Sequence, residues 1–309
     1  MWLYRAYGLV IGSSLPIPEM TPIERNERPG PDVDVDVDIR VDTVPEHLDK
    51  PEQSSSNHEA NGDHLLFRVP GVGRYLVSNG ASIVVDPAPE STSHEVRVFM
   101  LGTCFGAILH QRGFLVMHAS GIGTDRGAAL FAGPSGSGKS TLLSELLRRG
   151  YRMMVDDVSA ITLDPQGVPV VLPSYPRTRL WAETADRLGI ETSGRERTRP
   201  TMDKFEFQVP QQFWATTAPL RRLYHLTTST TRDLSLRRLD PIEAFPVVMN
   251  NTYRSALLDG FGLRRHHFDL ATAVSARVPV VRVVRPADTF RLTDLADEIL
   301  EDLLGSTDD

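Results

Sequence analysis

Three features that suit phosphate chemistry fall within one stretch, residues 115–161. His118 comes first, the glycine-rich loop 133–140 reads GPSGSGKS, and Asp156 and Asp157 follow as neighbours. An imidazole can hold or move a proton near neutral pH, a glycine-rich backbone can cradle phosphates, and carboxylates can bind a divalent cation or accept a proton. The stretch therefore predicts a site for a phosphorylated ligand.

The loop matches the phosphate-binding pattern G-x-x-x-x-G-K-[ST] in full. Its glycines permit a tight turn, and the amides at a helix start attract anions. Lys139 should reach the β- and γ-phosphates of ATP, and Ser140 should offer its hydroxyl to Mg²⁺. A loop that merely caps a helix would explain neither the lysine nor the flanking elements. The predicted nucleotide-binding residues are Gly133, Pro134, Ser135, Gly136, Ser137, Gly138, Lys139, Ser140 and Thr141.

The elements around this loop are predicted from hydrophobic periodicity. An amphipathic helix should begin at Lys139 and end near Gly150, with a leucine stripe on one side. Two strands joined by the turn 121–126 should precede the loop and place His118 on a strand. The stripe consists of Leu142, Leu143, Leu146 and Leu147.

Asp156 and Asp157 stand inside an apolar segment, 151–161, that reads as one strand. Carboxylates in such a place are costly unless a cation, hydrogen bonds or protonation compensates. Neighbours on a strand face opposite sides, so the two should have different roles unless a bulge intervenes. The alternatives are a turn or salt bridge for the aspartates and a core position for His118.

The rest of the chain predicts an α/β (α+β) protein with a boundary near residue 92. Residues 1–92 read as a β-rich region, with a mobile loop at 51–63, and 93–309 as a mixed catalytic part that starts with a core helix at 93–111. Residues 32–41 alternate as a strand whose four aspartates share a wet face, where a row of metal ligands is the alternative to simple solvation. A last strand at 278–286 and a last helix at 292–304 complete the prediction.

Composition sets limits on the partners. The 309 residues carry a formal charge of −7, with 5 basic against 13 acidic residues in 1–64 and 18 against 11 in 177–285. The later excess suits phosphate or an acidic partner, or simply a differently solvated surface. Nucleic acid is not an expected partner, and neither a membrane span nor a signal peptide is indicated, so a cytoplasmic location is the expectation. Cys104, the single cysteine, should be buried.

Several other residues are candidates of lower rank. Arg177 and Arg179 lie two apart, so an extended segment would point both to one side, where they could grip a phosphate. Lys204 belongs to a basic loop, 195–204, that could clamp a substrate. Surface solvation is the alternative for all three. Packing roles are expected for Trp181 and Trp214, and surface positions for His266 and His267.

Residues 115–161 resemble the catalytic core of the HPr serine kinase/phosphorylase family, with the histidine, the loop and the aspartate pair in the same order and at near-identical spacing. The segments 4–19, 173–181 and 278–286 are similar to the HPr-kinase-like proteins of lasso-peptide and related biosynthetic clusters. Those relatives phosphorylate a serine of a precursor peptide. The resemblance implies the phosphoenolpyruvate-carboxykinase-like P-loop fold and an ATP- and Mg²⁺-dependent kinase whose partner is a peptide or protein with an acceptor serine.

The resemblance also implies roles for the site residues. Asp156 would accept the hydroxyl proton of the acceptor, Asp157 would help to hold Mg²⁺, and His118 would contact the transferring phosphate or orient Asp156. The region 173–190 departs from the glycine-containing signature of HPr kinases proper, and the amino-terminal part differs too. Reverse phosphorolysis and HPr as the substrate are therefore in doubt.

Three alternatives stay open at the level of sequence. One is a regulatory kinase of the HPr type. Another is a nucleotide-gated ATPase or binding module, as in transporters, which should carry a distant catalytic acid and a signature helix; 255–260 is the nearest approach to that acid. In the third, the first ninety residues bind a peptide while the kinase core is inactive, against which stand the intact lysine and both aspartates. A homo-oligomer is left open.

Overall fold

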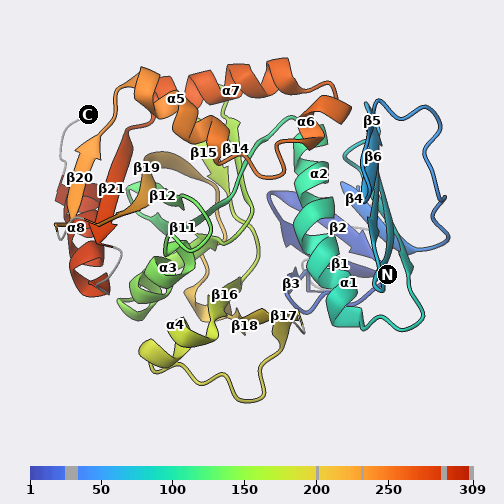
Figure 1. The fold of residues 1–309 in the computed structure, drawn as a ribbon, viewed down its shortest axis with the longest axis horizontal. Helices are drawn as coiled ribbons and strands as arrows, with labels where there is room; N and C mark the ends of the chain where they lie inside the picture. Colours follow the sequence, from blue (N-terminus) through green and yellow to red (C-terminus); the bar gives the residue numbers. More distant parts are fainter. Residues whose placement is uncertain (25–33, 200–201, 231–232, 287–290, 306–309) are drawn as a thin grey trace. The chain divides into compact units, whose positions relative to one another are not determined.

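The computed structural model is a mixed α/β structure that describes residues 1–24, 34–199, 202–230, 233–286 and 291–305. The chain forms two compact units (Figure 1). One combines Met1–Val116 with Tyr253–Asp269, and the other combines Met117–Thr252 with Leu270–Asp309. This division differs from the boundary expected near residue 92, because the helical segment up to residue 111 packs within the first unit.

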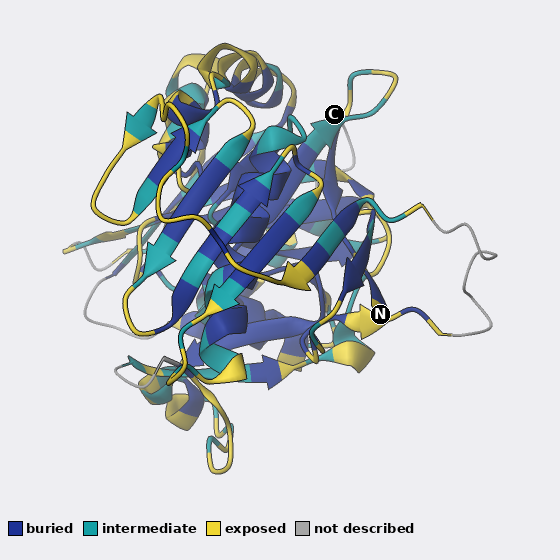
Figure 2. Ribbon diagram, turned by 90° about the vertical axis from the view of Figure 1, so that its right-hand side faces the viewer, coloured by how far each residue is buried: buried dark blue, intermediate teal, exposed yellow. Residues whose placement is uncertain are grey.

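The first unit is built on a nine-stranded sheet, counted over the described residues, with the order β3-β1-β2-β4-β9-β8-β7-β6-β5. Neighbours are antiparallel except that β4 runs parallel to both β2 and β9. Buried residues recur along these strands (Figure 2), as the strict alternation of β8 illustrates. The strands are β1 Trp2–Ala6, β2 Leu9–Ser13, β3 Thr21–Pro22, β4 Val37–Val41, β5 Gln53–Ser54, β6 His58–Asn61, β7 His64–Val69, β8 Gly73–Ser78 and β9 Ser82–Pro87.

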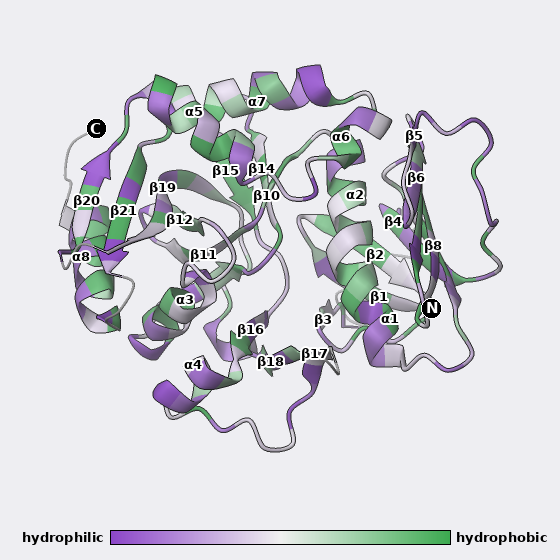
Figure 3. Ribbon diagram, viewed as in Figure 1, coloured by the Kyte–Doolittle hydropathy of each residue, from purple (hydrophilic) through white to green (hydrophobic). Residues whose placement is uncertain are grey.

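The predicted core helix is present in three parts: α1 (Ser93–Phe99), a π-helical turn (Met100–Cys104) and α2 (Phe105–Gln111). Thr92 begins it with a capping box to Glu95. Figure 3 shows α2 as mainly hydrophobic, and the helix packs on the sheet of this unit, where the hydroxyl of Tyr75 donates to the carbonyl of Val96. Cys104 is buried, as predicted. The short helix α6 (Leu257–Gly260) belongs to the same unit.

The structure differs from two expectations in this unit. The expected mobile loop at 51–63 contains β5 and β6, because Glu59 and Ala60 are buried and β6 pairs with β7. The expected strand at 32–41 is formed only at Val37–Val41; Asp34 and Asp36 lie outside it, and residues 32 and 33 lie outside the described residues. The polar composition of 51–63 does not reveal β5 and β6, because pairing with neighbouring strands makes them part of the sheet.

The second unit contains a mixed sheet in the order β14-β15-β19-β12-β11-β13, with β21 beside β19 and β20 beside β21. The long strand β19 runs parallel to both β12 and β21. The chain enters this unit through β10 (Leu115–Met117). The strands are β11 Ala119–Thr124, β12 Gly127–Ala132, β13 Arg152–Val155, β14 Ser159–Leu163, β15 Pro169–Leu172, β19 Ala218–Ser229, β20 Ser235–Arg238 and β21 Val280–Pro286.

A smaller sheet and several helices complete the second unit. The sheet has the order β16-β18-β17, from Arg177–Trp181, Met202–Gln208 and Arg197–Arg199. The predicted helix after the loop is α3, which begins at Lys139 and buries its leucine stripe against β12, β19, β21 and α8. The helices are α3 Lys139–Arg148, α4 Ala182–Arg187, the 3-10 turn Pro210–Gln212, α5 Pro241–Asn250, α7 Arg264–Arg277, which continues from the first unit, and α8 Leu292–Gly305.

None of the helices in the described part of the chain combines the length and the hydrophobicity that crossing a lipid bilayer requires.

Candidate functional site

The glycine-rich loop connects the end of β12 at Ala132 to the start of α3 at Lys139, as the sequence predicts. Three of its residues, Gly133, Gly136 and Gly138, have positive φ angles of 148°, 81° and 100°. A Cβ atom on Gly133 would lie 2.4 Å from the carbonyl oxygen of Leu226. The loop can therefore make its turn only with glycine at this position.

Lys139 is buried, and its ammonium group donates to two carbonyls of its own loop. The Nζ atom lies 2.8 Å from the Gly133 oxygen and 3.2 Å from the Pro134 oxygen. Burial lowers the pKa of Lys139, while the negative charges of Asp156 and Asp157 act in the opposite direction. The loop thus holds a cation at its own mouth, beside two carboxylates.

The two aspartates do not lie inside a strand, contrary to prediction. β13, which pairs with β11, ends at Val155, and β14, which pairs with β15, begins at Ser159. Between them Asp157 has a φ of 77°, in the left-handed region. His118 likewise occupies a bend between β10 and β11. The predicted turn at 121–126 is mostly strand, since β11 continues to Thr124. Hydrophobic periodicity predicted an uninterrupted strand at both places because the residues on either side of each break are apolar.

Asp156 is buried and accepts hydrogen bonds on both carboxylate oxygens. Oδ1 accepts from Ser120 Oγ at 2.6 Å and from Ser140 Oγ at 3.3 Å. Oδ2 accepts from Thr178 Oγ1 at 2.8 Å and from the Arg179 amide at 3.0 Å. These four donors satisfy the carboxylate and hold it against the start of α3.

Asp157 has a different set of partners, as expected for two residues with different roles. Its Oδ2 accepts from the Arg179 guanidinium at 2.9 Å, and Nδ1 of His118 lies 3.2 Å from its Oδ1. Burial alone would raise the pKa of Asp157, but the hydrogen bond from His118 and the charge of Arg179 hold it well below its ordinary range. Asp157 is therefore a carboxylate throughout the physiological pH range.

The His118 ring has a defined tautomer. Its Nδ1 atom lies 2.9 Å from the backbone oxygen of Asp157. A carbonyl oxygen can only accept, so Nδ1 carries the hydrogen and Nε2 is the basic nitrogen. The side chain is 36% exposed and lines the cavity, so a bound ligand can reach the ring.

Arg177 and Arg179 point to one side of β16, as the spacing predicts, and Glu206 on β18 lies opposite Arg179. Both guanidinium groups donate to Oε1 of Glu206, at 2.6 and 2.8 Å. Both are buried. The structure therefore gives these arginines carboxylate partners, and Arg179 links Glu206 to Asp157.

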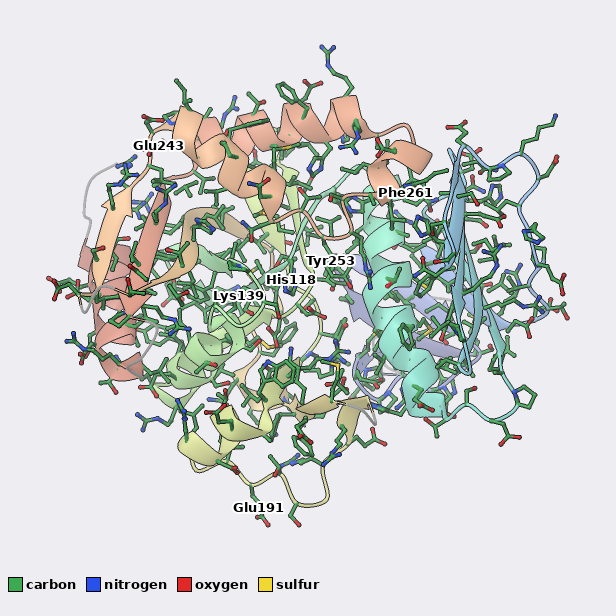
Figure 4. The ribbon with its side chains drawn as sticks, viewed as in Figure 1. His118, Lys139, Glu191, Glu243, Tyr253 and Phe261 are labelled. Carbon is green, nitrogen blue, oxygen red and sulfur yellow. The ribbon has the colours of Figure 1, made fainter. Side chains whose placement is uncertain are left out.

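The loop, both aspartates and His118 line one cavity of about 550 Å³ in the second unit. That volume suits a small-molecule ligand. Figure 4 marks His118 and Lys139, and Lys204 lines the same cavity, whereas Arg177 and Arg179 do not. The remaining lining residues are Ser120, Ser135, Gly136, Gly138, Ser140, Thr141, Trp181, Glu183, Thr184, Arg187, Leu234, Arg285, Pro286, Arg291, Leu292 and Leu295.

Arg285 is a site residue that the sequence motifs do not indicate. Its Nε donates to the Ser137 carbonyl at 3.0 Å and its Nη2 to the Gly136 carbonyl at 3.3 Å. Burial lowers the pKa of Arg285. The basic residue at the end of the predicted strand 278–286 was the available signal, but 148 positions separate it from Ser137. Ser120 and Thr178, which fix Asp156, were missed for the same reason.

Two aromatic predictions have different outcomes. Trp214 packs, because the Arg152 guanidinium stacks 4.3 Å from its ring and Gly123 lies against it. Trp181 does not: it is 43% exposed, lines the cavity and has the Lys204 ammonium 5.8 Å from its ring centroid. Leu180 is the last buried residue of β16, so Trp181 stands at the exposed end of the strand and does not pack in the core as expected.

The histidine pair at 266 and 267 belongs to the first unit. His266 is at the surface, as expected, and contacts the Gly113 carbonyl at 2.8 Å. His267 is buried instead, with its ring 6.2 Å from that of His110, and burial lowers its pKa to about 4. Helical periodicity turns the second histidine inward.

The donor set fits the cation that phosphate transfer normally requires. Mg²⁺ prefers hard oxygen ligands, usually one or two protein groups together with phosphate oxygens and water. The Ser140 hydroxyl and the Asp156 carboxylate lie side by side at the start of α3, at 3.3 Å. These two residues are the ones that would hold the ion.

No protein-family model matches the chain, and no curated protein matches it. Among solved structures, the chain is similar to the structure of the Hpr(Ser) kinase/phosphatase from Coxiella burnetii. That similarity has a TM-score of 0.35 and 11% sequence identity, and covers 62% of this chain and 91% of the other. At this level it establishes neither a family nor an activity.

Proposed function

We propose that the protein is an ATP- and Mg²⁺-dependent kinase that transfers the γ-phosphoryl group to an alcohol, namely a serine of a peptide or protein. The observation that carries the proposal is the shared cavity: the phosphate loop, two carboxylates and an imidazole line it together. Phosphoryl transfer needs charge neutralisation, in-line positioning and a proton acceptor, and little else. Each of these has a candidate group here.

The loop supplies the binding of the phosphates. Backbone amides at the start of α3 and the positive end of its dipole favour the phosphate charge. Lys139, which bonds to Gly133 and Pro134 across the loop mouth, exchanges those carbonyls for phosphate oxygens when the nucleotide binds. Arg285 fixes the carbonyls of Gly136 and Ser137, which keeps the neighbouring amides turned toward the ligand.

Asp156 and Ser140 are the proposed Mg²⁺ residues, whereas the family resemblance implies that Asp157 helps to hold Mg²⁺ and that Asp156 accepts the proton. The bound ion would neutralise charge on the phosphate oxygens. Asp156 suits this role because Ser120, Thr178 and the Arg179 amide fix its carboxylate next to Ser140.

The proposed proton acceptor is Nε2 of His118, with Asp157 as the group that positions it. Asp157 binds the Nδ1 side of the ring through its backbone and carboxylate oxygens, which stabilises the imidazolium after the hydroxyl proton is taken up. The low pKa of Asp157 makes its carboxylate a poor base but a good partner for that cation. Lys204 and Trp181 lie on this side of the cavity and are the proposed contacts for the acceptor.

The identity of the acceptor is the finest part of the proposal. The resemblance of the segments 4–19, 173–181 and 278–286 to the kinases of lasso-peptide clusters supports a serine of a precursor peptide. A regulatory kinase acting on a small carrier protein uses the same chemistry, and the substrate panel below separates the two.

The test is an assay of purified protein with ATP, Mg²⁺ and a panel of serine-containing peptides and carrier proteins, followed by mass spectrometry. We expect a gain of one phosphate on one acceptor, lost in Lys139→Ala and in Asp156→Asn. Arg148→Ala, at the far end of α3 with a side chain 65% exposed, is the control and should keep full activity. ATP hydrolysis with every acceptor unmodified would contradict the proposal and favour the ATPase alternative.

A further inference from the structure

We propose that the base and ribose of the donor nucleotide bind an apolar surface of the cavity, formed by Leu234, Pro286, Leu292 and Leu295. We call these four residues the leucine wall. The proposal rests on the proposed kinase function, because it assigns the nucleoside part of a ligand whose phosphates occupy the loop.

The leucine wall is assembled from three segments of the second unit. Pro286 ends β21, and Leu234 stands directly before β20, which pairs antiparallel with β21. Leu292 and Leu295 lie three apart on the first turn of α8, so they share one face of the helix. Both are largely buried in the core that α8 shares with α3, so the surface they present is fixed in place.

The rest of the cavity lining is mostly polar. Glycines aside, the described residues around the loop and the aspartates are charged or carry hydroxyl groups, except His118 and Trp181. A purine needs apolar contact on its faces, and small-molecule sites commonly supply it with aliphatic and aromatic side chains. The leucine wall is thus the part of this cavity that suits a base, while the carboxylate end suits phosphate and cation.

Arg285 joins the leucine wall to the phosphate loop. It precedes Pro286 in β21, and its guanidinium group bonds to the carbonyls of Gly136 and Ser137. A ligand with phosphates at the loop and its base on the wall would pass this side chain. One nucleoside triphosphate then accounts for both halves of the lining.

Trp181 is the competing platform for a base. Its ring faces the Lys204 ammonium, and Trp181 ends β16, the strand whose Thr178 and Arg179 side chains bond to Asp156 and Asp157. The tryptophan therefore belongs to the carboxylate end, where the γ-phosphoryl group must meet its acceptor. A base at that end would occupy the space the acceptor needs, so the leucine wall is the site that leaves the reaction possible.

The experiment compares two ligands that differ in the nucleoside. Titration calorimetry with Mg·ATP and with Mg·tripolyphosphate gives one affinity for phosphates plus base and one for phosphates alone. Leu234→Ala should weaken ATP binding about fivefold to tenfold and leave tripolyphosphate unchanged, because only apolar contact is removed. Leu234→Met, which keeps that contact, should bind both ligands as the wild type does. Leu234 is only partly buried, so the alanine variant should fold.

Two control variants make the result specific. Leu236→Ala removes a partly buried leucine that packs on the same core but does not line the cavity, and it should change neither affinity. Trp181→Ala should also leave ATP affinity unchanged. Selective loss of ATP affinity in Trp181→Ala, or an equal loss of both ligands in Leu234→Ala, would overturn the leucine wall as the nucleoside site.

The failure of the underlying function has a separate signature. A wild-type protein that binds neither ATP nor tripolyphosphate would contradict the proposed function and the leucine wall together. Selective loss of ATP affinity in Leu234→Ala, in a protein that modifies no acceptor, would support the nucleoside site and count against the kinase.

Discussion

Each unit of the molecule contains a cluster of one carboxylate, one arginine and one histidine. In the first unit, Glu59 on β6 accepts from Arg68 and pairs with Nδ1 of His47 at 2.8 Å. In the second, Asp157 accepts from Arg179 at 2.9 Å and pairs with Nδ1 of His118 at 3.2 Å. In both clusters these partners hold the pKa of the carboxyl group low although burial would raise it.

The two clusters differ in where the backbone places them. Glu59 lies within a continuous ladder, its side chain is 6% exposed, and the Leu48 amide also bonds to it at 2.7 Å. Asp157 lies in the connection between β13 and β14 with a positive φ, is 21% exposed and lines the cavity of the phosphate loop. The same three residue types therefore fasten a sheet in one place and face a ligand cavity in the other. Residue chemistry alone does not make a site.

The sharpest way to break this comparison is to neutralise both carboxylates. Asp157→Asn should lower the rate of phosphoryl transfer by up to about 10²-fold, because the His118 ring loses the carboxylate that positions it. Glu59→Gln should leave that rate unchanged. Initial rates with saturating ATP and acceptor measure both, and equal losses in the two variants would show that the clusters do not differ as claimed.

The histidines of the two clusters give a second comparison. A positioned base typically contributes about 10²-fold to a reaction rate. His118→Gln should lower the rate by that amount, because the reaction loses its proton acceptor. His47→Gln should preserve the rate. A rate that is unchanged in His118→Gln would rule out the ring as the proton acceptor.

The bonds from Arg285 to the phosphate loop can be tested in the same assay. Arg285→Ala should raise the KM for ATP about tenfold, since two loop carbonyls lose a charged donor. Arg285→Lys should recover part of the loss, because one ammonium replaces a two-armed contact. Arg282→Ala, on the same strand but not part of the cavity lining, is the matched control. A change in kcat with KM unaltered would be the wrong result.

The smallest effect concerns stability in the first unit. The pKa of Glu59 is lowered from 4.5 to about 2, where burial is outweighed by the bonds from Leu48, His47 and Arg68. Its stabilisation is therefore complete above pH 4.5 and is lost as the pH falls toward 2. Glu59→Gln should lower the free energy of unfolding by about 1 kcal/mol at pH 7. In urea titrations this difference in the free energy of unfolding should shrink as the pH falls from 4.5 toward 2. A difference that does not depend on pH would contradict the argument.

The elements around the site could be predicted where their signals are local. The start of α3 at Lys139, its leucine stripe and the core helix at 93–111 follow from spacing within a few turns. The break at Asp156 and Asp157 could not be predicted, because it depends on where the strand partners end. The strands at Gln53–Ser54 and His58–Asn61 were mistaken for a loop because sheet pairing, not composition, makes them strands.

The supporting residues of the site are beyond sequence reasoning for a related reason. Ser120, Thr178 and Arg285 are ordinary in type, and they reach Asp156 or the loop from strands 22 to 148 positions away. Only the topology of the sheets brings them together. A motif names the groups that contact the ligand, whereas the residues that fix their orientation are set by the fold.

The central claim is spatial, and a crystal structure with a non-hydrolysable ATP analogue and Mg²⁺ tests it most directly. We predict that the γ-phosphate lies within reach of the Lys139 ammonium group and that Mg²⁺ contacts the Ser140 hydroxyl and the Asp156 carboxylate. Nε2 of His118 should face the γ-phosphate from the side where the acceptor binds. An analogue bound with its γ-phosphate directed away from both aspartates and from His118 would contradict the account.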